Sequence, residues 1–171
     1  MAASPFLAYL LLEFHFREAL ALAVLAGLTD WLDGLLARRF HTSSRLGVIL
    51  DPIADKALLV TAFLTLGYIR LIPAWMMYLV IGRDVMIIAG ALFLRAMRDI
   101  PAFLPSPLGK VSTVFQIALV LVVLFEKSIK DGELSWIRMV LYCSAFFTIA
   151  SGADYVRRGI QMGMRKSIAA R

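Results

Sequence analysis

Residues 30–55 read DWLDGLLARRFHTSSRLGVILDPIAD and place four carboxylates beside long apolar runs: Asp30, Asp33, Asp51 and Asp55. The full pattern is D-x-x-D-G-x-x-A-R-x₈-G-x-x-x-D-x-x-x-D, whose other fixed members are Gly34, Ala37, Arg38 and Gly47. Acidic residues at apolar helices are costly in a membrane and are therefore candidates for function. The stretch predicts two helices that carry a polar site between them.

Composition sets the fold class. Hydrophobic residues make up 61% of the 171 residues, and the mean hydropathy is +0.81, far above the range of soluble domains. We predict one all-α integral membrane domain over residues 1–171, a bundle of about six transmembrane helices. The first apolar segment is too short to span a bilayer. The expected segments are 5–12, 19–36, 51–68, 73–94, 108–125 and 134–156.

The net charge of +6 does not indicate nucleic acid, because the basic residues cluster at the ends of apolar segments. Such clusters normally set membrane topology and contact anionic lipids. With alternating spans, most lysines and arginines fall on the side of the motif and the C-terminus, which predicts that this side faces the cytoplasm. The basic stretch after Tyr155 either rests on lipid headgroups or is simply a stop-transfer signal.

The spacing of the aspartates indicates a metal site. Residues three or four apart share a helix face, so each pair of carboxylates points one way. Four converging carboxylates repel one another unless cations balance them, and hard oxygen ligands suit two Mg²⁺ or Mn²⁺ ions. Gly34 and Gly47 allow close approach of a ligand, and Arg38 offers a forked donor to phosphate. In the alternative, Asp51-Pro52 is an ordinary helix start, Arg38 only a topology charge, and D-x-x-D a solvated helix end.

The segment 30–55 resembles the signature of the CDP-alcohol phosphotransferases at every defining position. The runs LIPAWMMYLVIGRDVMIIAGALFLR, PSPLGKVSTVFQIALV and FFTIASGADYVRRG resemble later helices of the branch that includes phosphatidylglycerophosphate synthases and CDP-diacylglycerol-dependent cardiolipin synthases. The resemblance implies an enzyme that transfers a phosphatidyl group from CDP-diacylglycerol and releases CMP. It also implies a homodimer in a bacterial inner membrane or the mitochondrial inner membrane, with its site facing the cytoplasm or matrix.

The resemblance also implies roles for individual residues. The four aspartates would hold two metal ions, and Asp55 would also be the general base for the acceptor hydroxyl. The CDP pocket would be lined by Gly34, Ala37, Arg38 and Gly47, with Arg38 on the diphosphate. Family members usually begin with a longer first helix and an interfacial segment that binds nucleotide. We therefore expect the start at Met1 to be truncated or misassigned; the alternative is that this member has lost part of its donor pocket.

The acceptor is the open question at the level of sequence. Arg83 and Asp84 lie in the middle of an apolar segment, where charges are costly. Their side chains should diverge by about 100° on a helix, so we expect no simple mutual neutralisation. Arg83 is the candidate for the acceptor phosphate, with a structural ion pair between helices as the alternative. Lys110 is a second candidate, or only a flanking topology charge.

The patterns R-D-V-M-I-I-A-G and K-V-S-T-V-F-Q resemble cardiolipin synthases more than phosphatidylglycerophosphate synthases, whereas the run F-T-I-x-S-G-x-x-Y resembles the latter at least as well. On balance the resemblance implies phosphatidylglycerol as acceptor, giving cardiolipin. Glycerol 3-phosphate, giving phosphatidylglycerophosphate, is the alternative. A diacylated acceptor needs an apolar opening, which the runs 85–94 and 111–124 could wall. A rival of another class is a non-catalytic membrane protein or a cation transporter, in which the acids and Arg83 would form an ion path.

Overall fold

A computed structural model describes residues 3–40, 47–98, 106–129 and 136–169. Within these ranges the side chains of 30–31, 33–40, 47–55, 91–98 and 162–169 are outside the description. The described chain is entirely helical, which confirms the predicted all-α class. Its helices are α1 (Ala3–Leu12), α2 (Phe16–Phe40), α3 (Gly47–Tyr68), α4 (Ala74–Arg98), α5 (Pro107–Ser128) and α6 (Trp136–Ala169).

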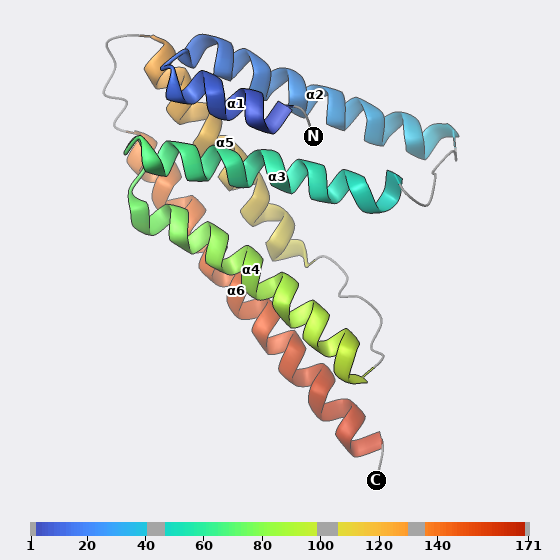
Figure 1. Cartoon of the computed structure of the whole chain (residues 1–171). Helices are drawn as coiled ribbons and strands as arrows, with labels where there is room; N and C mark the ends of the chain where they lie inside the picture. The colour runs from blue at the N-terminus through green and yellow to red at the C-terminus, as the bar shows by residue number, and fades with distance from the viewer. Residues whose placement is uncertain (1–2, 41–46, 99–105, 130–135, 170–171) are drawn as a thin grey trace.

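Two groups of helices make up the molecule. The short helix α1 packs against both α2 and α3, α2 packs against α5, and α4 runs alongside α6 (Figure 1). The helix α5 joins the groups because it also packs against α6 and touches α3. The core between them is apolar and includes Leu7, Leu11, Phe63, Leu66, Met76, Leu119 and Leu124. The C-terminal part of α6 extends away from the α1–α2–α3 group (Figure 1).

Short connections fix the first helices. The turn after α1 places Phe14 at φ 58°, and the N–H of His15 bonds to the carbonyl of Leu10 at 2.8 Å. The turn after α3 places Arg70 at φ 60°, and the N–H of Leu71 bonds to the carbonyl of Leu66 at 2.9 Å. In both cases a left-handed residue reverses the chain and satisfies a carbonyl at the end of a helix.

Buried polar side chains join α5 to α6. Gln116 donates from Nε2 to Oγ1 of Thr148 at 3.0 Å and to Oγ of Ser112 at 3.3 Å, and all three residues are buried. Thr148 in turn donates to the carbonyl of Ser144 at 2.7 Å. Hydrogen bonds of this kind hold helices together where apolar surfaces give no preference for one partner. Gln116 on α5 thus bonds to a residue of the neighbouring helix α6.

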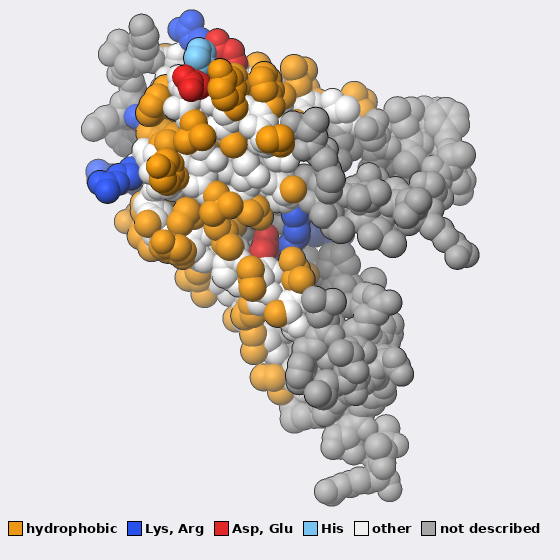
Figure 2. All heavy atoms as spheres, in the orientation of Figure 1, with side chains coloured by type: hydrophobic (Ala, Val, Ile, Leu, Met, Phe, Trp, Pro, Cys, Tyr) orange, Lys and Arg blue, Asp and Glu red, His pale blue; other side chains and the backbone are white. Residues whose placement is uncertain are grey.

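Two of the described helical stretches are long and apolar enough to cross a membrane, Pro107–Ser128 and Trp136–Gln161. The number of spans therefore remains a prediction. Hydrophobic side chains cover much of the described surface in Figure 2, while charged ones lie at its upper end, at its left edge and in a small group near the middle. On α6 the exposed residues Met139, Tyr142, Phe146 and Ile149 recur every three or four positions and so form one stripe. Such a stripe fits a helix that faces lipid or another protein.

Every helix is longer than its apolar segment. The helix α3 begins at Gly47, so Pro52 lies in its second turn, and the alternative of Asp51-Pro52 as the helix start is wrong. The helix α6 continues to Ala169 rather than ending near Val156. Hydropathy marks where a helix meets lipid, whereas arginine and lysine continue a helix well. An ion pair one turn apart, Arg158 Nε to Asp154 Oδ2 at 2.9 Å, lies in this extension.

Candidate functional site

The aspartate motif lies on two consecutive helices. Asp30 and Asp33 belong to the second half of α2, and Asp51 and Asp55 belong to the first turns of α3. The C-terminal end of α2 and the N-terminal end of α3 lie on the same side of the molecule (Figure 1). The side chains of these residues, and those of Gly34, Ala37, Arg38 and Gly47, fall outside the described ones. Their roles in metal and donor binding therefore remain predictions.

Arg83 lies at the centre of a buried polar cluster on α4. It is only 7% exposed, and its Nη1 donates to Oδ1 of Asp84 at 2.6 Å. The expectation that these neighbours cannot neutralise each other is wrong. The side chains start about 100° apart, but the arginine is long enough to reach back to the carboxylate. Asp84 is equally buried, at 6% exposed.

Residues of α6 hold the rest of the guanidinium. Nη2 of Arg83 donates to Oγ of Ser151 at 2.6 Å, and Cζ lies 5.7 Å from the centroid of the Tyr155 ring. That distance permits a cation–π interaction. The Nε of Arg83 is buried and has no hydrogen-bond partner among the described residues. The guanidinium is thus oriented on two sides and still has one donor to satisfy.

The first turn of α5 closes the cluster. Ser106 is the N-cap, and its Oγ accepts from the N–H of Gly109 at 2.9 Å, while Pro107 occupies the first helical position. The N–H of Ser106 donates to the hydroxyl of Tyr155 at 3.3 Å. A Cβ on Gly109 would lie 3.2 Å from Nη2 of Arg83 and 3.4 Å from Cε2 of Tyr155. Glycine at this position lets α5 approach the guanidinium closely.

Lys56 connects the cluster to the motif helix. Its Nζ lies 3.2 Å from Oδ1 of Asp84, the same oxygen that Arg83 contacts. Lys56 directly follows Asp55 on α3, and its side chain is 43% exposed. Lys56, Ser151 and Tyr155 were not predicted from the sequence as members of the site. Lys56 had a usable signal, since a lysine within an apolar helix needs a partner.

Lys110, the second acceptor candidate, lies one residue beyond Gly109 on α5, and its side chain is exposed. The structure thus brings Arg83 into the cluster and places Lys110 at its outer edge. Among the described side chains there is no group of three or more histidines, cysteines or acids that could hold a metal. The four motif aspartates are not part of that set.

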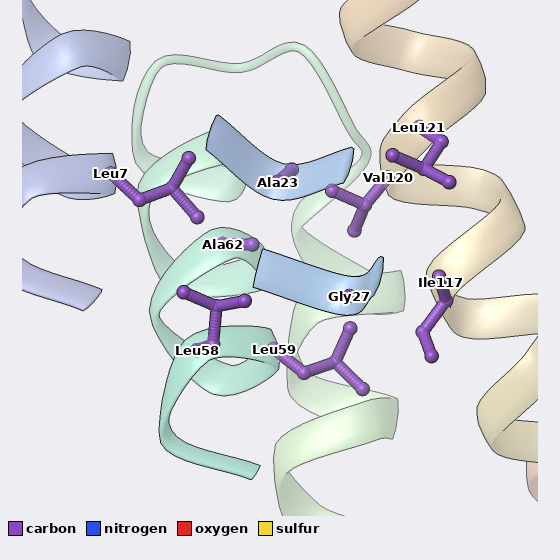
Figure 3. Close-up of a pocket in the computed structure, with 9 residues that line it drawn as sticks. All are labelled: Leu7, Ala23, Gly27, Leu58, Leu59, Ala62, Ile117, Val120 and Leu121. Carbon is purple, nitrogen blue, oxygen red and sulfur yellow. The ribbon is translucent and has the colours of Figure 1, made fainter. Parts of the chain in front are cut away.

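An apolar pocket lies next to the motif helices. Its volume is about 60 Å³, enough for several groups of the size of water or a methylene. Figure 3 shows its lining: Leu7, Ala23, Gly27, Leu58, Leu59, Ala62, Ile117, Val120 and Leu121. Gly27 precedes Asp30 by one turn, and Leu58 and Leu59 follow Asp55 by one turn. The described lining includes residues of the run 111–124 and none of the run 85–94.

Comparison with known proteins gives the family. The model of the CDP-alcohol phosphatidyltransferase family matches residues 1–150, which include the whole motif and the Arg83 cluster as far as α5. The chain belongs to the CDP-alcohol phosphatidyltransferase family. The resemblance found in the sequence is thereby confirmed.

Two kinds of relative are similar over most of the chain. The cardiolipin synthase (CMP-forming) of Rattus norvegicus is 36% identical and that of Homo sapiens 35%, each over 91% of this chain. The CDP-diacylglycerol–glycerol-3-phosphate 3-phosphatidyltransferase of Aquifex aeolicus is 34% identical over 93% of this chain and 90% of that protein. The chain spans 57% of the length of the rat and human relatives. The relatives therefore leave the acceptor open.

Proposed function

We propose that the chain transfers a phosphatidyl group from CDP-diacylglycerol to the hydroxyl of a glycerol-type acceptor and releases CMP. Membership of the family, together with the complete motif on the consecutive helices α2 and α3, carries this proposal. The apolar pocket one turn from the motif supports a donor that bears acyl chains. A non-catalytic membrane protein or cation transporter would need neither the glycines and arginine of the motif nor this pocket.

The donor set of the motif fits two divalent cations. All four positions are carboxylates, two on each of two consecutive helices, and oxygen donors suit Mg²⁺ or Mn²⁺. We propose that Asp30, Asp33, Asp51 and Asp55 hold them. When bound, such ions would neutralise the diphosphate and the charge that develops on the departing CMP. The CDP moiety would be lined by Gly34, Ala37, Arg38 and Gly47, with Arg38 on the diphosphate.

In the transfer, the acceptor oxygen would bond to the phosphorus that carries the diacylglycerol. The bond from that phosphorus to the CMP oxygen would break, and the hydroxyl proton would pass to Asp55 as general base. Arg83 would bind the phosphate that the acceptor already carries. Its orientation by Asp84, Ser151 and Tyr155 supports this role, because a guanidinium held in place loses little freedom on binding. Lys110 would assist from the outer edge of the cluster.

We propose phosphatidylglycerol as the acceptor, with cardiolipin as product and glycerol 3-phosphate as the alternative. The sequence runs around Arg83 and Lys110 and the similarity to the rat and human cardiolipin synthases support this order. The similarity to the Aquifex aeolicus protein supports the alternative. We further propose a homodimer in a bacterial or mitochondrial inner membrane, with the motif facing the cytoplasm or matrix, as the basic flanks favour.

The test is product analysis with purified protein. The protein is incubated with CDP-diacylglycerol, Mg²⁺ or Mn²⁺ and one acceptor, and lipids are identified by mass spectrometry. The expected result is cardiolipin with phosphatidylglycerol and little phosphatidylglycerophosphate with glycerol 3-phosphate. The opposite pattern would reverse the order of the two acceptors. If neither acceptor gave CMP, the proposed activity would be wrong.

A further inference from the structure

The polar cluster on α4 holds two cations on one carboxylate oxygen. Nη1 of Arg83 lies 2.6 Å and Nζ of Lys56 lies 3.2 Å from Oδ1 of Asp84. These three groups, which we call the charge triad, carry a formal charge of +1. Neither cation is saturated, since the Nε of Arg83 has no partner among the described residues and the lysine side chain is 43% exposed.

We propose that Asp84 and Lys56 set the charge of an acceptor-phosphate site built on Arg83, so that the site selects a phosphodiester over a phosphomonoester. The inference rests on the proposed function and deepens it. A phosphodiester carries one negative charge at neutral pH, which matches the charge of the triad. Lys110 is left out of this sum because its side chain is exposed and its charge is screened by solvent. A phosphomonoester carries about −1.5 to −2 at pH 7 and leaves charge uncompensated in a buried site, which is costly.

The position of the triad suits this role. Lys56 directly follows Asp55, the proposed general base, so a phosphate held at Lys56 lies close along α3 to the group that takes the acceptor's proton. Ser151 and Tyr155 fix the other side of the guanidinium. The triad thereby links α3 to the α4–α6 pair through charged contacts. Asp84 in this scheme touches no reacting atom and is a positioning and specificity-determining residue.

The wild type and three variants of the triad separate the effect of its charge from the effect of its shape. The wild-type triad carries +1, Asp84→Asn raises it to +2, Lys56→Met lowers it to 0, and the double variant returns it to +1. The asparagine keeps an oxygen that can accept from both cations, so Asp84→Asn changes charge with little change in shape. Glu18→Gln on the exposed start of α2 is the control for loss of an acidic charge, because it lies outside the triad.

The probes are two soluble compounds that share a glycerol phosphate and differ in charge. Glycerol 3-phosphate is the monoester, and glycerophosphoglycerol, the deacylated headgroup of phosphatidylglycerol, is the diester. Each is measured as a competitor of phosphatidyl transfer by the full chain in detergent. Its effect on the unfolding temperature of each variant is measured as well.

The quantity to compare among the variants is the ratio of the inhibition constant of glycerol 3-phosphate to that of glycerophosphoglycerol. The wild type is expected to favour the diester, and Asp84→Asn to shift the ratio toward the monoester by about tenfold or more, from one unit charge at an intermediate dielectric. The double variant is expected to return to the wild-type ratio, and Glu18→Gln to leave it unchanged. An equal effect of Asp84→Asn on both probes, or no recovery in the double variant, would overturn the proposal.

Failure of the proposed function would look different. In that case the wild type would release no CMP with either acceptor, while the unfolding temperatures would still report the binding of both anions. If the shifts in unfolding temperature caused by the two compounds differed, and if that difference changed with the charge of the triad, the triad would be an anion site even without the transfer reaction. Equal shifts for all four proteins would refute it. Each variant is checked by gel filtration, and a single peak at the elution volume of the wild type shows that it is folded.

Discussion

Gly109→Ala tests the packing around Arg83 directly. The added Cβ would lie 3.2 Å from Nη2 of Arg83, 3.2 Å from Oγ of Ser106 and 3.4 Å from Cε2 of Tyr155. Each neighbour is already held: the guanidinium by Asp84 and Ser151, and the hydroxyl of Ser106 by the N-cap bond. These groups must shift by a few tenths of an ångström, and the guanidinium is the one whose position matters to a ligand.

The expected effect on stability is small because two terms oppose each other. Alanine in place of glycine favours a helix by up to about 1 kcal/mol, while crowding a packed site costs roughly 1–3 kcal/mol. The free energy of unfolding should therefore fall by about 1 kcal/mol. The effect on acceptor affinity should be larger than the effect on stability. A displaced hydrogen bond to a charged group costs roughly 1.5–3 kcal/mol, which is about tenfold or more in acceptor affinity.

Gly82→Ala is the matched control, since it lies on α4 beside Arg83 and its Cβ would meet nothing within 4 Å. The assay is the KM for acceptor and donor in phosphatidyl transfer, together with thermal unfolding in detergent. Gly109→Ala should raise the acceptor KM at least tenfold more than Gly82→Ala, with the donor KM unchanged. Equal acceptor KM values for the two variants would refute the packing argument.

Three further outcomes are expected. Asp55→Asn should bind CDP-diacylglycerol in a binding assay but transfer 10²–10⁴-fold more slowly at saturation, as loss of a general base predicts; weak donor binding with normal turnover would contradict that role. Removal of divalent cations with a chelator should abolish CMP release, and Mg²⁺ or Mn²⁺ should restore it; full activity in excess chelator would contradict the metal site. Ala62→Phe should fill the apolar pocket and raise the KM for a long-chain donor more than the KM for a short-chain donor. The control Leu64→Phe, at a 46% exposed leucine of α3, should not have this effect. If Ala62→Phe changed the KM equally for both donors, the pocket would not be an acyl-chain pocket.

Hydropathy was sufficient to predict the helices but not their ends. Each apolar segment corresponds to one helix, because a run of mostly apolar residues must be buried in protein or in lipid. The ends differ because Gly47 and most of the residues after Val156 are polar or small yet continue a helix. Helix formation there depends on backbone hydrogen bonds and local pairs such as Asp154–Arg158, which hydropathy does not measure.

Local spacing could predict only the part of the site whose residues are close in sequence, and the metal-binding and donor-binding roles of those residues remain predictions. The spacing within residues 30–55 indicated both the chemistry and the family, since i, i+3 and i, i+4 pairs lie on one helix face. The partners of Arg83 were not predictable in this way. Ser151 and Tyr155 are on α6, far along the chain, and Lys56 meets Asp84 only through the packing of α3 against α4. Such contacts depend on the tertiary arrangement and leave no local pattern.

The length of the arginine side chain explains why the expectation that Arg83 and Asp84 do not neutralise each other was wrong. The directions of Cβ atoms on a helix predict that Arg83 and Asp84 diverge. The arginine has four rotatable bonds beyond Cα and bends back to its neighbour, because a buried guanidinium without a counter-ion costs more than an unextended side chain. Spacing rules hold well for short side chains such as aspartate and poorly for arginine or lysine.

The measurement that tests the central claim most directly is the release of CMP from CDP-diacylglycerol by the purified chain, with the wild type and Asp51→Asn compared under one concentration of Mn²⁺. The lipid product is quantified in the same samples with phosphatidylglycerol and, separately, with glycerol 3-phosphate as acceptor. We expect one new phospholipid per CMP released by the wild type, and a loss of orders of magnitude in the variant, with its folded state retained, because it lacks a metal ligand. Absence of CMP with both acceptors, or equal release by Asp51→Asn, would contradict it.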